Sequence, residues 1–122
     1  MKKVGYFEGT DSTILATLAA EGIDTLPLGN GEDGYGKYIG HITKGDNISL
    51  VVGYLHKVIP LAEMAAKSSD ILYSCTVHKI PVVLLVPKQF HEKAKKVLGD
   101  IAEKVRLVDS KNALNEIMKL LG

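Results

Sequence analysis

Two runs of nearly continuous apolar residues constrain the fold of this chain more than any other feature. They cover residues 48–55 (ISLVVGYL) and 80–86 (IPVVLLV). Strands of this kind are buried on both faces, and such burial is typical of parallel sheets with helices on either side. Both segments are therefore predicted to be strands in the middle of a parallel sheet.

Three shorter segments complete the predicted sheet, namely residues 4–7, 24–28 and 105–108. Pro27 lies in the second of them and cannot donate a hydrogen bond to a neighbouring strand, so that strand is expected at an edge of the sheet. Arg106 lies in the third, and a charged side chain in so short a strand favours the opposite edge.

Apolar residues at helical spacing lie between these strands. A first helix is predicted with Asp11 or Ser12 as its N-cap and Gly22 as a left-handed C-terminal cap. A second is predicted over residues 89–104, and a last one is predicted to be capped by Ser110. The residues expected to face the core are Ile14, Leu15, Leu18 and Ala19 in the first helix, Phe90, Ala94, Val97, Leu98 and Ile101 in the second, and Leu114, Ile117, Met118 and Leu121 in the last.

Residues 60–79 fit two interpretations. Polar residues at steps of three or four favour a helix, whereas alternation over residues 71–77 fits a strand. The helix is favoured because the polar stripe runs through the whole segment. The stripe consists of Glu63, Lys67, Asp70, Ser74 and His78, and the residues expected to face the core are Leu61, Met64, Ala65, Ser68, Leu72 and Cys75.

Strands that alternate with helices predict a single α/β domain over residues 1–122, with right-handed crossovers. The expected architecture is a three-layer Rossmann-like or flavodoxin-like domain. About five mostly parallel strands in the order 2-1-3-4-5, with about four helices, would build it. This order places the two expected edge strands at the two edges of the sheet.

Composition excludes several classes of partner. A net charge of +1, a single arginine and no tryptophan argue against a nucleic acid or an anionic membrane surface. Cys75 is the only cysteine, which fits a reducing compartment. Glu8 and Asp11 interrupt the N-terminal apolar run too early for a signal peptide, and no apolar run is long enough to span a membrane. We therefore expect a cytoplasmic protein.

The expected strand order predicts where a ligand binds. In an open α/β sheet the site lies beyond the carboxyl ends of the strands, where the strand order reverses. Here that place lies between the first and third predicted strands, which deliver Glu8 and residues 9–13 on one side and Tyr54, His56 and Lys57 on the other. The expected ligand-binding residues are Gly9, Thr10, Asp11, Ser12, Thr13, Tyr54 and Lys57.

Two features of this edge each have two interpretations. The free amides and hydroxyls of residues 9–13 could hold an anion, or they could simply cap the first helix. His56 could act as a general acid or base oriented by Glu8, or His56 and Lys57 could be solvent-facing loop residues. Both alternatives stay open at this point.

Residues 29–47 form an unusually long connection with six glycines. Gly29, Gly31 and Gly34 match the G-x-G-x-x-G spacing, but a dinucleotide site also needs a firm strand before this motif and a helix after it. The preceding strand contains Pro27, and the residues that follow contain further glycines. A flexible loop, or a lid over a ligand or a partner subunit, is favoured instead.

No metal site or known catalytic motif is predicted. Cys75 and His78 are three residues apart, but a metal would need more ligands nearby, so Cys75 is expected to be a small core residue. The phospho-acceptor aspartate of response-regulator receivers, the Cys-x5-Arg loop of low-molecular-weight phosphatases and the Asp-x-His-x-x-Gly motif of corrinoid-binding domains are absent.

These observations favour a small-ligand-binding or regulatory domain without turnover. Its expected ligand is small and anionic or nucleotide-like, and no cofactor is identified. A transferase or hydrolase that uses His56, or a subunit that docks a protein through residues 29–47, are the alternatives. A homo-oligomer is expected from the apolar segment 54–59, which leaves the sheet at the predicted crevice.

Overall fold

The computed structural model describes residues 2–60 and 66–122. In these residues six parallel strands form one sheet in the order β3-β2-β1-β4-β5-β6. The five predicted strands occur in the predicted order, and β3 is an additional strand from the glycine-rich segment. The strands are β1 (Lys3–Phe7), β2 (Asp24–Gly29), β3 (Lys37–Tyr38), β4 (Leu50–Tyr54), β5 (Val82–Leu85) and β6 (Val105–Val108).

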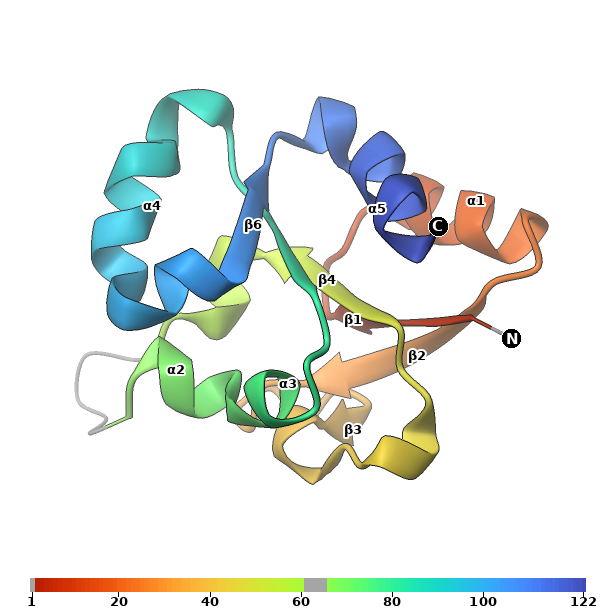
Figure 1. Cartoon of the computed structure of the whole chain (residues 1–122), viewed down its shortest axis with the longest axis horizontal. Coiled ribbons are helices and arrows are strands. Elements are labelled where there is room, and N and C mark those ends of the chain that lie inside the picture. The colour runs from red at the N-terminus through yellow and green to blue at the C-terminus, as the bar shows by residue number, and fades with distance from the viewer. Residues whose placement is uncertain (1, 61–65) are drawn as a thin grey trace.

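Helices cover both faces of this sheet, which gives the predicted three layers. In Figure 1, α1 and α5 lie together on one side of the strands, and α2, α3 and α4 lie on the other. The α-helices are α1 (Ser12–Ala20), α2 (Ser68–Ile71), α3 (Tyr73–Val77), α4 (His91–Leu98) and α5 (Ala113–Leu121). Within the described residues, short 3-10 segments link the elements: η1 (Ile39–His41), η2 (Lys44–Asp46), η3 (Leu55–Val58), η4 (Lys88–Phe90), η5 (Gly99–Lys104) and η6 (Ser110–Asn112).

The two apolar runs are buried because successive side chains enter different cores. In β5, Val82 and Leu84 pack with α2, α3 and α4, whereas Val83 and Leu85 pack with α1 and α5. β4 repeats this pattern, with Val51 on the first side and Leu50 and Val52 on the second. The continuous hydrophobicity of both segments therefore reflects two separate hydrophobic cores, one on each face of the sheet.

The expectation that residues 24–28 form an edge strand was wrong. β3 pairs with β2 through Leu28 and Gly29. Pro27 precedes these residues and pairs with β1 alone, opposite Tyr6, so its missing donor does not prevent the pairing with β3. β6 pairs only with β5 and is an edge strand, as Arg106 indicated.

The segment 68–77 is helical, which confirms the favoured interpretation for that part of the chain. Ser68, Leu72 and Cys75 are buried, as the helical stripe predicted. The predicted core positions Leu61, Met64 and Ala65 lie outside the described residues.

Two other predicted helices differ from their expected bounds. Helix α4 ends at Leu98, because Gly99 has a φ of 68° and leaves the helical conformation. The chain continues as η5, so the single helix over residues 89–104 was wrong. The start of α5 also differs. The Asp109 carboxylate accepts a hydrogen bond from the Lys111 amide, and Asp109 rather than Ser110 caps the turn η6 that leads into α5.

Four residues expected in the core are exposed instead, and the first of them is Ala19 near the end of α1, where only Ile14 and Leu18 are buried. Phe90 lies in η4 before α4 begins, and Val97 projects away from the stripe formed by Ala94 and Leu98. Met118 is exposed on α5, next to the buried Ile117. The helices therefore present narrower apolar faces to the sheet than the sequence suggested.

Cys75 is buried, and burial raises the pKa of its thiol to about 12. Since an ordinary cysteine has a pKa of about 8.5, the folded protein at pH 8 should hold on the order of a thousandfold less thiolate than the unfolded chain. We therefore expect iodoacetamide to alkylate the folded protein at least a hundredfold more slowly than the urea-unfolded protein, as followed by mass spectrometry. Equal rates would contradict the burial of this thiol.

None of the helices formed by the described residues is long and apolar enough to cross a membrane. Within residues 2–60 and 66–122, no three His, Cys, Asp or Glu side chains are grouped as a metal site.

Candidate functional site

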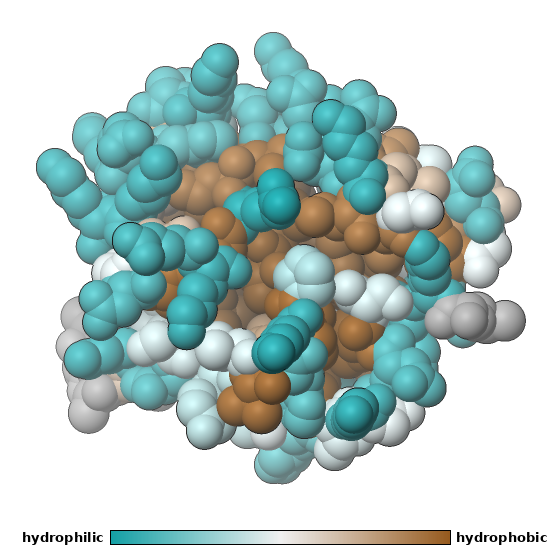
Figure 2. All heavy atoms as spheres, viewed as in Figure 1, coloured by the Kyte–Doolittle hydropathy of each residue, from teal (hydrophilic) through white to brown (hydrophobic). Residues whose placement is uncertain are grey.

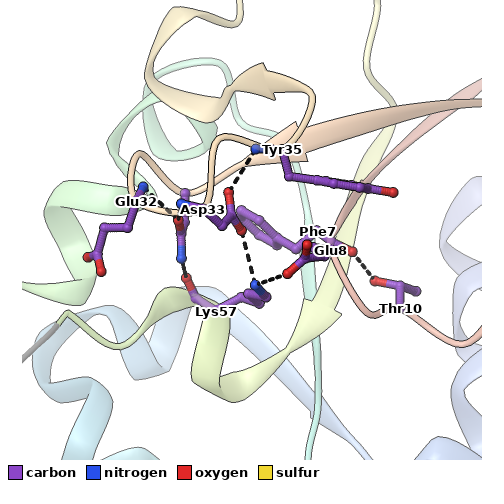
Figure 3. Close-up of polar contacts among 8 residues, drawn as sticks. Phe7, Glu8, Thr10, Glu32, Asp33, Tyr35 and Lys57 are labelled. Atoms are coloured by element: carbon purple, nitrogen blue, oxygen red, sulfur yellow. Dashed lines mark hydrogen bonds and ion pairs between the residues drawn. The ribbon is translucent and has the colours of Figure 1, made fainter.

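The carboxyl end of β1 is the point where the strand order reverses. The chain leaves β1 through α1 and pairs β2 on one side, and β4 later pairs on the other side. The residues that follow β1, β2 and β4 meet beyond this edge (Figure 3). In open α/β sheets this is the place where ligands bind.

The turn after β1 is organised around Thr10 and Asp11. Thr10 is buried, and both its hydroxyl and its amide donate hydrogen bonds to the Phe7 carbonyl, at 2.7 and 3.3 Å. Asp11 is the N-cap of α1, and its carboxylate accepts a hydrogen bond of 2.8 Å from the Thr13 amide. The start of α1 is therefore already occupied by a carboxylate of the chain itself. This arrangement matches the capping interpretation of residues 9–13.

Lys57, from the turn η3 after β4, is the centre of the site. Its ammonium lies 2.8 Å from a Glu8 carboxylate oxygen and 3.0 Å from an Asp33 carboxylate oxygen (Figure 3). The side chains of Lys57 and Asp33 are only 12% and 13% exposed, whereas that of Glu8 is half exposed. One lysine thus joins the loops that follow β1, β2 and β4.

The electrostatics of this cluster favour its charged form. Hydrogen bonds to Glu8 and Asp33 raise the pKa of Lys57. Desolvation opposes ionisation of Asp33, but hydrogen bonds from the Lys57 ammonium and the Tyr35 amide outweigh it and lower the pKa of Asp33. Both groups therefore stay ionised across the neutral pH range.

Residues 30–36 form a folded loop over this cluster. The Asn30 side-chain amide donates a hydrogen bond of 2.9 Å to the Lys57 carbonyl, and its oxygen accepts one from the Glu32 amide. The Asp33 carboxylate accepts a further one of 3.1 Å from the Tyr35 amide. Lys57 therefore holds this part of the glycine-rich segment through both its backbone and its side chain.

Tyr35 brings an aromatic ring back to the end of β1. Its ring centroid lies 6.1 Å from that of Tyr6, at an angle of 67°. The neighbouring Tyr35 hydroxyl, together with desolvation, raises the pKa of Tyr6. A hollow of about 340 Å³ adjoins this loop, and it is lined by Gly29, Gly31, Gly34, Tyr35, Gly36 and Tyr38.

The predicted acid–base pair does not form in this structure. Glu8 contacts Lys57 rather than His56, and among the described residues no hydrogen bond reaches the His56 ring. His56 is exposed and its ring stacks on Tyr54, with centroids 6.3 Å apart. The catalytic role of His56 therefore remains a prediction.

Of the predicted site residues, the structure brings Lys57, expected to bind a ligand, together with Glu8, expected to orient His56. Tyr54 is half buried near His56, Gly9 has a φ of 84° in the turn after β1, and Ser12 and Thr13 are exposed at the start of α1. Sequence reasoning missed Asn30, Asp33 and Tyr35. Their signal was the glycine-rich segment itself, which contains acidic and amide side chains in an otherwise small-residue loop.

Residues 29–34 lead into β3 and 3-10 turns rather than a helix, so the G-x-G-x-x-G spacing lacks the context of a dinucleotide site.

The apolar segment 54–59, which motivated the prediction of a homo-oligomer, packs within the domain. Val58 is fully buried, and Leu55 and Ile59 contact the core beside α2, α3 and α4.

No protein-family model, curated protein or solved structure matches this chain.

Proposed function

We propose that this domain binds a small, planar, polar molecule of nucleoside type beyond the carboxyl ends of β1 and β4, without turnover. The observation that carries the proposal is the contact of Lys57 with both Glu8 and Asp33. This contact orders a glycine-rich loop over the place where α/β sheets bind ligands. A loop tied to this point is suited to cover a bound molecule.

The charges at this edge favour a neutral or donor-bearing ligand over a free anion. Three carboxylates, of Glu8, Asp11 and Asp33, accompany the single ammonium of Lys57. A phosphate would have to replace a carboxylate at Lys57 and would be repelled by the others. Of the two ligand types expected from the sequence, the geometry therefore supports the nucleotide-like type through its base and sugar hydroxyls.

The adjoining hollow supports a planar group. Tyr35 and Tyr38 line it, and the four glycines that complete its lining leave it open. A volume of about 340 Å³ is at the lower end of small-ligand sites. Tyrosine rings provide a flat surface for stacking.

A thermal-shift experiment tests this proposal. Adenosine, guanosine and riboflavin are compared with inorganic phosphate on the wild type, on Tyr35→Leu and on Tyr73→Leu, a control at an exposed tyrosine on α3. A ligand that binds only the folded state raises the melting temperature. We expect at least one of the three neutral compounds to raise it for the wild type and Tyr73→Leu but not for Tyr35→Leu. No shift with any of them, or an equal shift in Tyr35→Leu, would overturn the proposal.

The two alternatives have weaker support. A transferase or hydrolase that uses His56 rests on the exposure of this residue at the same edge, and loss of turnover in His56→Ala would be its test. Docking of a partner protein through residues 29–47 is less favoured, because Asn30, Asp33 and Tyr35 are engaged with residues of the domain itself.

A further inference from the structure

A second hollow lies at the other end of the strands from the candidate site, beside the amino ends of β5 and β6. It has a volume of about 330 Å³ and is enclosed by α3, the chain that enters β5, and the end of η5. Figure 1 shows α3 and the beginning of β6 on the viewed face, and Figure 2 shows apolar atoms over the middle of this face within a hydrophilic surround. The residues that line the hollow are Leu72, Cys75, Thr76, Lys79, Ile80, Pro81, Val82, Ile101, Lys104 and Val105.

The lining combines an apolar wall with two cations. Seven of its ten residues are aliphatic, proline or cysteine, while Lys79 and Lys104 are its charged members. No carboxylate lines the hollow, and within the described part of the chain neither lysine forms an ion pair. The hollow is thus positively charged, whereas the cluster of Glu8, Asp33 and Lys57 has a net negative charge.

The backbone of Lys79 supplies an independent observation. The Ile80 amide donates to the Cys75 carbonyl at 2.9 Å and the Lys79 amide donates to the Thr76 carbonyl at 3.3 Å, which is the Schellman pattern at the end of α3. Lys79 is the left-handed residue of this pattern, with a φ of 55°. Glycine adopts this conformation without strain, whereas lysine does so at a cost in stability. Strained residues of this kind cluster at ligand sites.

We propose that this hollow binds a small amphipathic anion, that is, a short hydrocarbon chain or single ring that carries one carboxylate. The apolar wall would cover the hydrocarbon part, since burying apolar surface is favourable. Lys79 and Lys104 would bind the carboxylate at the rim through charge-assisted hydrogen bonds. The size of the hollow limits the ligand to the small end of the range that proteins bind in pockets.

Octanoate is a suitable probe, with octanol and octylamine as probes of equal chain length and different head groups. Binding is followed by ¹⁵N–¹H correlation spectra of the wild-type protein. We expect octanoate to bind at least tenfold more tightly than octanol and octylamine, with the largest shifts at Thr76, Lys79 and Val105. Equal affinities for octanoate and octanol, or shifts that instead concentrate around Glu8 and Lys57, would overturn the proposal.

The variant Lys79→Gly tests whether the Lys79 side chain binds the ligand or whether this residue only terminates α3. This variant relieves the left-handed strain, so it should melt at a higher temperature than the wild type, yet it should bind octanoate at least fivefold more weakly. Asn47→Gly is the matched control, because Asn47 is the other described non-glycine residue with a positive φ, 56°. It should not melt at a lower temperature than the wild type, and it should bind octanoate as the wild type does. Unchanged octanoate affinity in Lys79→Gly would contradict the role of Lys79.

Discussion

Gly53→Ala is expected to lower the free energy of unfolding by about 2–3 kcal/mol, as overpacking of a dense core does. Gly53 lies in the buried strand β4, and a Cβ atom there would approach Phe7 to 2.6 Å at Cδ2 and 3.0 Å at Cβ. The Phe7 Cβ is fixed to the β1 backbone, so rotation of the ring cannot relieve the contact. Strands β1 and β4 would have to separate, and urea unfolding would measure the loss.

Gly5→Ala is the matched control for this prediction. It is the same substitution on the adjacent strand β1, where the new Cβ would approach Leu28 to 2.6 Å at Cδ1 and 3.3 Å at Cγ. These atoms are the far end of a flexible side chain that can change rotamer, so we expect a loss of less than about 1 kcal/mol. Equal losses of stability in the two variants would mean that the contact with Phe7 is no harder to relieve than the contact with Leu28.

The position of Gly53 connects this prediction to the candidate site. Phe7 directly precedes Glu8, and Gly53 directly precedes Tyr54. A displacement of Phe7 by an added methyl group would therefore be passed to the ends of both strands at the point where the strand order reverses. In Gly53→Ala we expect amide resonance shifts at Glu8 and Lys57 under conditions where the variant is still folded.

Much of the architecture was predictable because it depends on local patterns. Continuous apolar runs at residues 48–55 and 80–86 indicated burial on both faces, and the sheet buries both segments in this way. The predicted order placed residues 24–28 and 105–108 at the two edges of the sheet. The relative order of the five predicted strands is correct, although only β6 is an edge strand, because β3 pairs with β2. Polar stripes located the helical segment 68–77 without any knowledge of its neighbours.

What could not be predicted depends on contacts between distant residues. Strand β3 is only two residues long, and pairing with Leu28 and Gly29 defines it rather than any propensity of its own. Gly36 lies directly before it with a φ of 59°, and a Cβ there would collide with the Pro27 carbonyl oxygen. Only glycine allows the chain to approach β2 so closely, and its partner is nine residues away in the sequence.

The candidate site was likewise predictable only where it depends on a local pattern. The rule for parallel sheets placed Glu8 and Lys57 at one edge, and they contact each other there. Asp33 comes from a segment with no regular pattern. Its pairing with Lys57 links residues 24 positions apart, and it depends on the conformation of the whole loop.

Lys57→Met is expected to lower the free energy of unfolding by about 2–3 kcal/mol near neutral pH. Methionine keeps the length of the aliphatic stem and the backbone contact with Asn30, so the variant removes chiefly the charge. Asp33 would remain mostly buried without its cation, and an unpaired buried charge is more costly than the pair is favourable. The partial exposure of Glu8 keeps the effect below that of a fully buried pair.

The effect of Lys57→Met should depend on pH with a defined sign. The pKa of Asp33 is lowered in the folded protein, so its contribution is present above the unfolded pKa of about 3.9 and is lost as the pH falls through the folded value. The pKa of Lys57 is raised, so its contribution is present below about 10.4 and is lost as the pH rises further. The difference between wild type and variant should therefore be largest between about pH 5 and 10.

Lys95→Met is the control, because it removes a lysine from an exposed ion pair with Glu92 at 3.4 Å. Exposed pairs of this kind contribute little, so its free energy of unfolding should stay within about 0.5 kcal/mol of the wild type at every pH. If Lys57→Met behaved in the same way, the ion pair would not hold residues 30–36 over the end of β1. A large, pH-dependent loss confined to Lys57→Met would instead identify this lysine as the residue that orders the loop, and so as the first position at which to test the proposed ligand binding.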